Sequence, residues 1–230
     1  MYPIEQIAPR PTLAASYGAL LKFFGLFLLV FTLLMSPWSG FKEGYAAGFR
    51  TVGNIAFTSF GSTGRVRFEP SSEGDRRHDT VLILINTATG VGSQAPTSSR
   101  FMGYVPTALV LALVLATPLP WRRRLTAAAW GLLWVNLFVL FRLLLSLLND
   151  FQGAAPSDLY SLGPMAAKCL YFAYLVLAGS AAGAFIVPVL IAASVCFHGG
   201  AWSGFVSGDR NAASVHSGHP LKSGGRRRRM

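Results

Sequence analysis

Long, uninterrupted apolar blocks are the feature that most limits what this chain can fold into. They occupy residues 17–37, 105–121, 125–148 and 166–197. Crossing a bilayer takes roughly 20 apolar residues in a helix, because the hydrocarbon core is about 30 Å thick. The blocks do not alternate with the period of two that a membrane β-barrel requires. We therefore predict an all-α membrane protein, a polytopic bundle of about four transmembrane helices with a small external β-hairpin segment.

Composition and charge agree with a membrane location. Of the 230 residues, 52% are hydrophobic and 13% are charged, which is little charge for a soluble domain. The net charge of +11 lies between and beside the apolar blocks, where basic residues set topology and contact lipid headgroups. The lipid bilayer is thus the expected partner, and nucleic acid is not expected.

Residues 1–38 are predicted to hold a polar lead and the first transmembrane helix. Lys22 lies near the start of that apolar block, and Trp38 lies at its far end, a common position for tryptophan at a membrane interface. A cleaved signal peptide is the alternative. No small-x-small cleavage pattern follows promptly, which favours an uncleaved anchor.

Residues 39–100 are predicted to form an external segment. Residues 65–69 alternate polar and apolar side chains, residues 80–86 are rich in β-branched side chains, and turn-forming residues lie between them. This pattern predicts a β-hairpin, which has to lean on the membrane helices or on a partner because two strands alone are marginal. Residues 41–60 are expected to extend the first helix or form an interfacial helix, and residues 87–99 to form a loop.

Residues 101–197 are predicted to form a three-helix transmembrane region, with a kink at Pro188 in its over-long last helix. Residues 198–230 are predicted to be a disordered basic tail, because they hold too few apolar side chains to fold. The run Arg122–Arg124 between two apolar blocks decides the orientation under the positive-inside rule. We expect a multi-pass protein of the bacterial inner (plasma) membrane with both termini cytoplasmic.

Arg142 is the main candidate for a binding residue, because a cation inside an apolar block costs roughly 2.5–3.5 kcal/mol and is often functional. It either snorkels to the external interface or lines a site that binds a substrate or partner. Asn136 is a second tentative binding residue in the same block. The two lie about 120° apart around a helix, so Asn136 is expected to hydrogen-bond to another helix.

Gly179 and Gly183 have the small-x-x-x-small spacing that lets a second helix approach closely. We predict a helix-packing role for this pair. Packing within the chain is favoured over packing between two copies, because the pattern is common in membrane helices.

The sequence shows no residue pattern typical of catalysis or metal binding. Cys169 and Cys196 lie too far apart along one helical block to form a disulfide, and no histidine is close to Cys169 in sequence. His216 and His219 lie in the predicted tail and make a poor metal site. The phosphate-binding, zinc-protease and serine-hydrolase motifs are missing. We expect no metal and no cofactor, and the balance is against an enzyme.

One stretch carries a family resemblance. From Ser99 to Leu147 an external loop leads into an apolar block, a tight basic turn follows, and the next block holds Asn136 and then Arg142. This arrangement resembles part of the exosortase and archaeosortase membrane transpeptidases, which use a Cys, Arg and His set. The family cysteine and histidine are missing here, so only Arg142 carries over. The chain is also similar to the small accessory membrane proteins of exosortase systems, which implies a non-catalytic partner.

These features favour a non-catalytic integral membrane accessory protein in bacterial envelope protein sorting or export, working beside another membrane protein. Two alternatives stay open. A membrane-embedded cysteine transpeptidase or protease-like enzyme would use Arg142 and Cys169. A small transporter or channel subunit would need more polar groups inside the membrane than Asn136 and Arg142 provide.

Overall fold

The computed structural model describes residues 13–36, 40–71, 78–153 and 159–198. In chain order the elements are α1 (Leu13–Met35), α2 (Phe41–Phe57), β1 (Ser59–Phe60), β2 (Gly64–Pro70), β3 (Thr80–Asn86), β4 (Val91–Thr97), η1 (Arg100–Tyr104), α3 (Val105–Ala116), α4 (Trp121–Gly153), α5 (Pro164–Ala173), η2 (Tyr174–Gly179) and α6 (Ala181–His198), of which η1 and η2 are π-helical. Beyond His198, the predicted basic tail lies outside the described residues.

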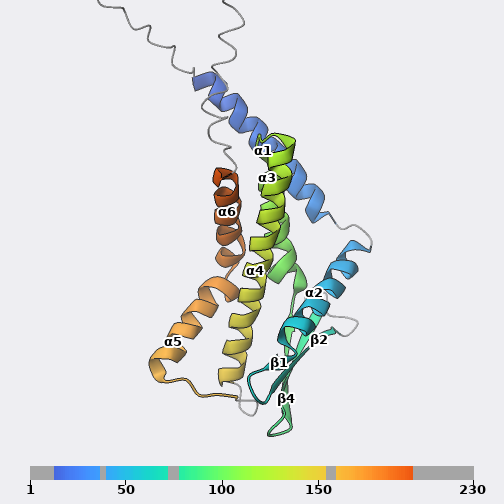
Figure 1. Cartoon of the computed structure of the whole chain (residues 1–230), viewed down its shortest axis with the longest axis vertical. Coiled ribbons are helices and arrows are strands. Elements are labelled where there is room, and N and C mark those ends of the chain that lie inside the picture. Colours follow the sequence, from blue (N-terminus) through green and yellow to red (C-terminus); the bar gives the residue numbers. More distant parts are fainter. Residues whose placement is uncertain (1–12, 37–39, 72–77, 154–158, 199–230) are drawn as a thin grey trace, which may run out of the picture.

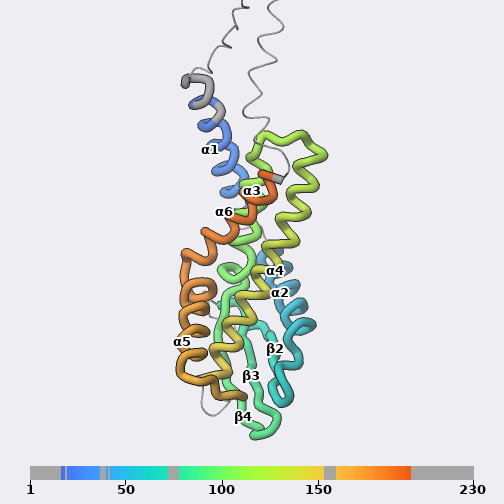
Figure 2. Tube along the Cα trace, turned by 60° about the vertical axis from the view of Figure 1, so that its left-hand side comes forward, coloured from blue at the N-terminus to red at the C-terminus, as the bar shows by residue number. Residues whose placement is uncertain are grey.

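The molecule is elongated, and its sheet lies near one end, beside α2 and the last turns of α4 (Figures 1 and 2). The start of α1, the end of α6 and the turn between α3 and α4 lie at one end, and the sheet lies at the other (Figures 1 and 2). The long helix α4 runs from the first end down to the level of the sheet (Figure 1). The basic turn at the start of α4 is therefore far from the sheet.

Residues 39–100, which were predicted to be an external segment, contain a four-stranded antiparallel sheet in the order β1-β2-β3-β4, so the predicted two-stranded hairpin is too small. The two predicted strands are β2 and β3, which pair with Phe68 opposite Leu82. The added strand β4 falls in the stretch predicted as a loop, because its Gly, Ser and Pro residues have low β-propensity. Pro96 fits there because β4 is an edge strand.

One face of the sheet packs against helices. Val66, Phe68, Leu82 and Leu84 point to that face and form a buried cluster with side chains of α2 and α4. Asn54 of α2 also binds the backbone of Phe68: its Nδ2 donates to the carbonyl (3.1 Å), and its Oδ1 accepts from the N–H (2.8 Å). The amide thereby supplies the two hydrogen bonds that a neighbouring strand would give at this position.

The predicted all-α bundle of about four transmembrane helices is wrong for the residues that the structure describes. One helix there, α4, is long and apolar enough to cross a bilayer, and the bent pair α5–η2 and α6 adds a second if its halves make one crossing. The apolar stretches Leu20–Met35 and Arg100–Ala116 are shorter than a crossing requires. The second of these ends early because Pro118 and Pro120 cannot continue a helix.

The predicted kink lies at Ser180 and not at Pro188. The axes of α5–η2 and α6 differ by 74° across this residue, whose backbone is extended. Its Oγ accepts a hydrogen bond from the N–H of Gly183 (3.2 Å), which is the geometry of a serine that caps a helix N-terminus. A new helix thus starts after Ser180, and Pro188 is accommodated inside it.

Candidate functional site

Arg142 lies inside the molecule, with 3% of its surface exposed. Its Nη1 donates to the backbone carbonyls of Phe101 (3.2 Å) and Met102 (3.1 Å) in η1. Its Nη2 donates to the carbonyl of Ala178 in η2 (3.0 Å). One guanidinium group therefore joins α4 to two π-helical segments that are distant in sequence.

The carbonyls that Arg142 binds lack their usual helical donors. In the i→i+5 pattern of η1, the Phe101 carbonyl would accept from residue 106, and in an α-helical pattern Met102 would accept from the same residue. That residue is Pro106, which has no N–H. Ala178 stands one residue before the end of η2, where carbonyls have no partner within the helix. Arg142 satisfies all three groups.

This geometry gives Arg142 a structural role that sequence reasoning missed. A guanidinium has its donors in a fixed planar fork, which suits it to bridging carbonyls on separate segments. Its Nε is buried and has no hydrogen-bond partner among the described residues. Binding of a substrate or partner by Arg142 stays a prediction. The signal in the sequence was a proline at the start of one apolar block and an arginine inside the next.

Asn136 lies on a different side of α4 from Arg142, so the structure does not bring the two tentative binding residues together. Its side chain is exposed, and its Nδ2 donates to the carbonyl of Leu132 in the same helix (2.7 Å). The expected bond to another helix is replaced by this local one. Asn136 also lines a gap of about 470 Å³ between α4 and the glycines of α2.

Gly179 and Gly183 lie on either side of the bend at Ser180. Gly183 is buried, and a Cβ there would overlap the carbonyl oxygen of Leu177 in η2. Gly179 is exposed, and the nearest atoms to a Cβ there would be those of Tyr174 at 3.6 Å. Gly183 thus lets α6 start close against η2. Two other helices also approach each other closely at Gly131 of α4, where a Cβ would lie 2.9 Å from Cγ1 of Val110 in α3.

The two cysteines are both free. Cys169 is exposed on α5, and Cys196 is buried on α6 with its Sγ 3.6 Å from Oγ1 of Thr117. The described residues contain no group of three or more His, Cys, Asp or Glu side chains placed to hold a metal ion.

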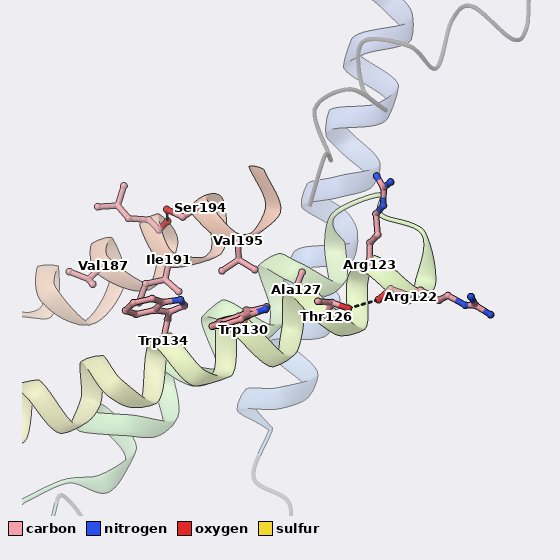
Figure 3. Close-up of a pocket in the computed structure, with 11 residues that line it drawn as sticks. Arg122, Arg123, Thr126, Ala127, Trp130, Trp134, Val187, Ile191, Ser194 and Val195 are labelled. Carbon is pink, nitrogen blue, oxygen red and sulfur yellow. Dashed lines mark hydrogen bonds between the residues drawn. The ribbon is translucent and has the colours of Figure 1, made fainter. Parts of the chain in front are cut away.

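A further candidate site is a groove between α4 and α6, with a volume of about 1150 Å³. Trp130 and Trp134 of α4 lie along it, facing Ile191 and Val195 of α6 (Figure 3). Its lining residues are Arg122, Arg123, Thr126, Ala127, Trp130, Trp134, Val187, Leu190, Ile191, Ser194 and Val195. We call this feature the α4–α6 groove.

The α4–α6 groove is apolar along its length and basic at one end. The hydroxyls of Thr126 and Ser194 donate to carbonyls of their own helices, at 3.1 and 2.8 Å. Arg122 and Arg123 extend from the first turn of α4, beyond the row of tryptophans (Figure 3). Sequence reasoning used the arginines for topology and as part of the family resemblance. The signal that could have found the site is two tryptophans four residues apart, directly after a basic turn.

Comparison with known proteins gives no match: no family model matches the sequence, no curated protein matches it, and no solved structure matches the chain. The resemblance to exosortase-type membrane proteins therefore stays a prediction.

Proposed function

We propose that the chain is an integral membrane protein that acts as a non-catalytic accessory in bacterial envelope protein sorting or export. The observation that carries the membrane part is the apolar surface of α4 and α6. Leu133 and Leu137 of α4 are 57% and 53% exposed, and Ile186 of α6 is 58% exposed. Large exposed apolar surfaces of this kind are typical of contact with lipid or with another protein.

The distribution of charge supports an orientation in the inner membrane. The basic turn Arg122–Arg124 lies at the same end of the molecule as the start of α1 and the end of α6 (Figures 1 and 2). Basic residues close to membrane helices remain in the cytoplasm. In this proposal the start of α4 and the end of α6 lie on the cytoplasmic side.

The accessory role rests on the family resemblance and on the outer face of the sheet. Val81, Ile83 and Ile85 of β3 alternate with the buried residues and remain partly exposed. Arg65 and Arg67 of β2 stand opposite Ile85 and Ile83 in the register. An apolar strip bordered by arginines has the composition of a protein contact surface. We propose that this strip binds another membrane protein of the same envelope system.

Carbonate extraction and photo-crosslinking test the two parts of this proposal. The protein should stay in the carbonate-washed membrane pellet, and release into the supernatant would refute membrane integration. A photoreactive residue at Ile83 should capture one envelope protein, whereas the same residue at Thr51, which is exposed on α2, serves as the matched control.

A deletion strain tests the process itself. Without the gene, proteins with C-terminal sorting tags should accumulate unprocessed, and unchanged processing would refute the accessory role. Complementation with a Cys169→Ala, Cys196→Ala double variant should restore processing fully. Failure of this variant at normal abundance would favour the cysteine-enzyme alternative.

A further inference from the structure

We propose that the α4–α6 groove is a binding site for an anionic phospholipid, with an acyl chain along Trp130 and Trp134 and the phosphate at Arg122 and Arg123. The inference rests on the membrane integration proposed above and adds a specific ligand class to it. It follows from the apolar floor of the groove, from the position of Arg122 and Arg123 at its mouth, and from the presence of basic side chains at one end only.

The floor of the groove suits a hydrocarbon chain. Trp130 and Trp134 are four residues apart on α4, so their indoles lie on one face of the helix, and they are 53% and 50% exposed. Ile191 and Val195 of α6 form the opposite wall (Figure 3). Since the two hydroxyls of the lining are bonded to their own helices, the middle of the groove offers apolar contact and little competition from water.

The mouth of the groove suits a phosphate. Arg122 and Arg123 are exposed at the start of α4, where the helix dipole adds a partial positive charge. Arg124 of the same turn closes the α3–α4 connection, because its Nη2 donates to the carbonyl of Thr117 (3.3 Å). The lining residues of the groove, all of them in the described part of the chain, include no acidic side chain. A guanidinium group can donate two parallel hydrogen bonds to phosphate oxygens, which favours an anionic phosphate headgroup over a neutral headgroup.

A lipid fits this arrangement better than a helix of a partner or of a second copy. Close helix packing in membranes uses small residues that let backbones approach. The floor here instead consists of two half-exposed indoles. An apolar body with a basic mouth matches a molecule that has an acyl chain and an anionic head. The groove volume of about 1150 Å³ lies just above the range of typical small-molecule sites, which is roughly 300–1,000 Å³.

The tryptophans of the groove allow a direct test. In a variant with Trp38, Trp121 and Trp202 changed to Phe, the remaining fluorescence comes from Trp130 and Trp134. This full-length variant is placed in phosphatidylcholine nanodiscs that contain a minor fraction of one brominated lipid, which quenches indoles on contact. Brominated phosphatidylglycerol should quench more strongly than brominated phosphatidylcholine, with a local enrichment of about thirtyfold for two arginines near the headgroup region.

Two charge variants distinguish a specific lipid site from general electrostatic attraction between the basic protein and anionic lipid. Arg122→Gln with Arg123→Gln should abolish the preference for phosphatidylglycerol. Arg65→Gln with Arg67→Gln removes the same charge from the sheet and should leave the preference intact. Circular dichroism and elution volume show that each variant is folded.

Three results would overturn the inference. Equal quenching by the two brominated lipids refutes the lipid site but not the proposed membrane integration. An equal loss of the preference for phosphatidylglycerol in both charge variants has the same meaning. Equal quenching together with a dimeric elution volume assigns the groove to a second copy. A protein that does not enter the nanodiscs refutes both the lipid site and the proposed membrane integration.

Discussion

Replacing Arg142 by methionine keeps a long side chain but removes every donor that holds η1 and η2 against α4. Three hydrogen bonds are lost, to Phe101, Met102 and Ala178. An average interhelical hydrogen bond in a membrane protein contributes about 0.6 kcal/mol. A bond from a charged donor contributes about 1.5 kcal/mol or more. We therefore expect Arg142→Met to lower the free energy of unfolding by about 2–4 kcal/mol.

In the proposed membrane location, the insertion energy gained by removing the charge does not offset this loss of hydrogen bonds. In unfolding by SDS in mixed micelles, α4 stays inserted in both the folded and the unfolded state, so the insertion cost of the charge is present in both. Arg142→Lys should fall between the wild type and Arg142→Met, because an ammonium lacks the planar fork and reaches fewer of the carbonyls.

SDS titration monitored by circular dichroism measures these differences. Arg65→Met is the matched control, since Arg65 is exposed on the sheet, and it should change the free energy of unfolding by less than about 0.5 kcal/mol. An Arg142→Met variant as stable as the wild type would refute the reasoning. It would show that the carbonyls of η1 and η2 find other donors at no cost.

Three further predictions concern other parts of the fold. Gly183→Ala should destabilise the protein by roughly 1–3 kcal/mol, because the new Cβ would overlap a backbone carbonyl oxygen. Gly179→Ala should be tolerated, since a Cβ there has room. Equal effects of the two variants in SDS titration would contradict the assigned bend. Asn54→Asp should cost about 1–3 kcal/mol, because the carbonyl of Phe68 loses its donor, and an unchanged midpoint would argue against this contact. Burial raises the pKa of Tyr45 from 10.0 to about 12. As the pH rises, the tyrosine therefore ionises in the unfolded state before it ionises in the folded state. The stability that is present below pH 10 is lost as the pH rises toward 12. Tyr45→Phe should lose less stability over that window in alkaline unfolding, and an identical loss would show that Tyr45 ionises normally.

The parts of the fold that follow a local pattern could be predicted from the sequence, and the parts that depend on tertiary contacts could not. Strands β2 and β3 were predicted because β-branched and alternating residues have a local preference for strands. Strand β4 has no such preference and exists because it pairs with β3. The count of membrane helices failed because average hydropathy does not show where a helix ends.

Arg142 and the α4–α6 groove illustrate the same limit. The importance of Arg142 was visible as a charge in an apolar block, but its partners lie about 40 residues away on either side and depend on two π-helical segments. The α4–α6 groove was not predicted, because it forms only after the bend at Ser180 places α6 beside α4. That bend was hidden in a block that reads as one continuous apolar helix.

The pairing of Pro106 with Arg142 has a consequence for how the two positions can vary. Pro106 removes the N–H that would serve the carbonyls of η1, and Arg142 replaces it from another helix. The contribution of Arg142 to stability therefore depends on the presence of Pro106. In a Pro106→Ala background the helix can supply its own donor, so Arg142→Met should be less harmful there than in the wild type. A double-mutant cycle would show a coupling energy of about 1 kcal/mol or more, which is epistasis between two residues whose side chains need not touch.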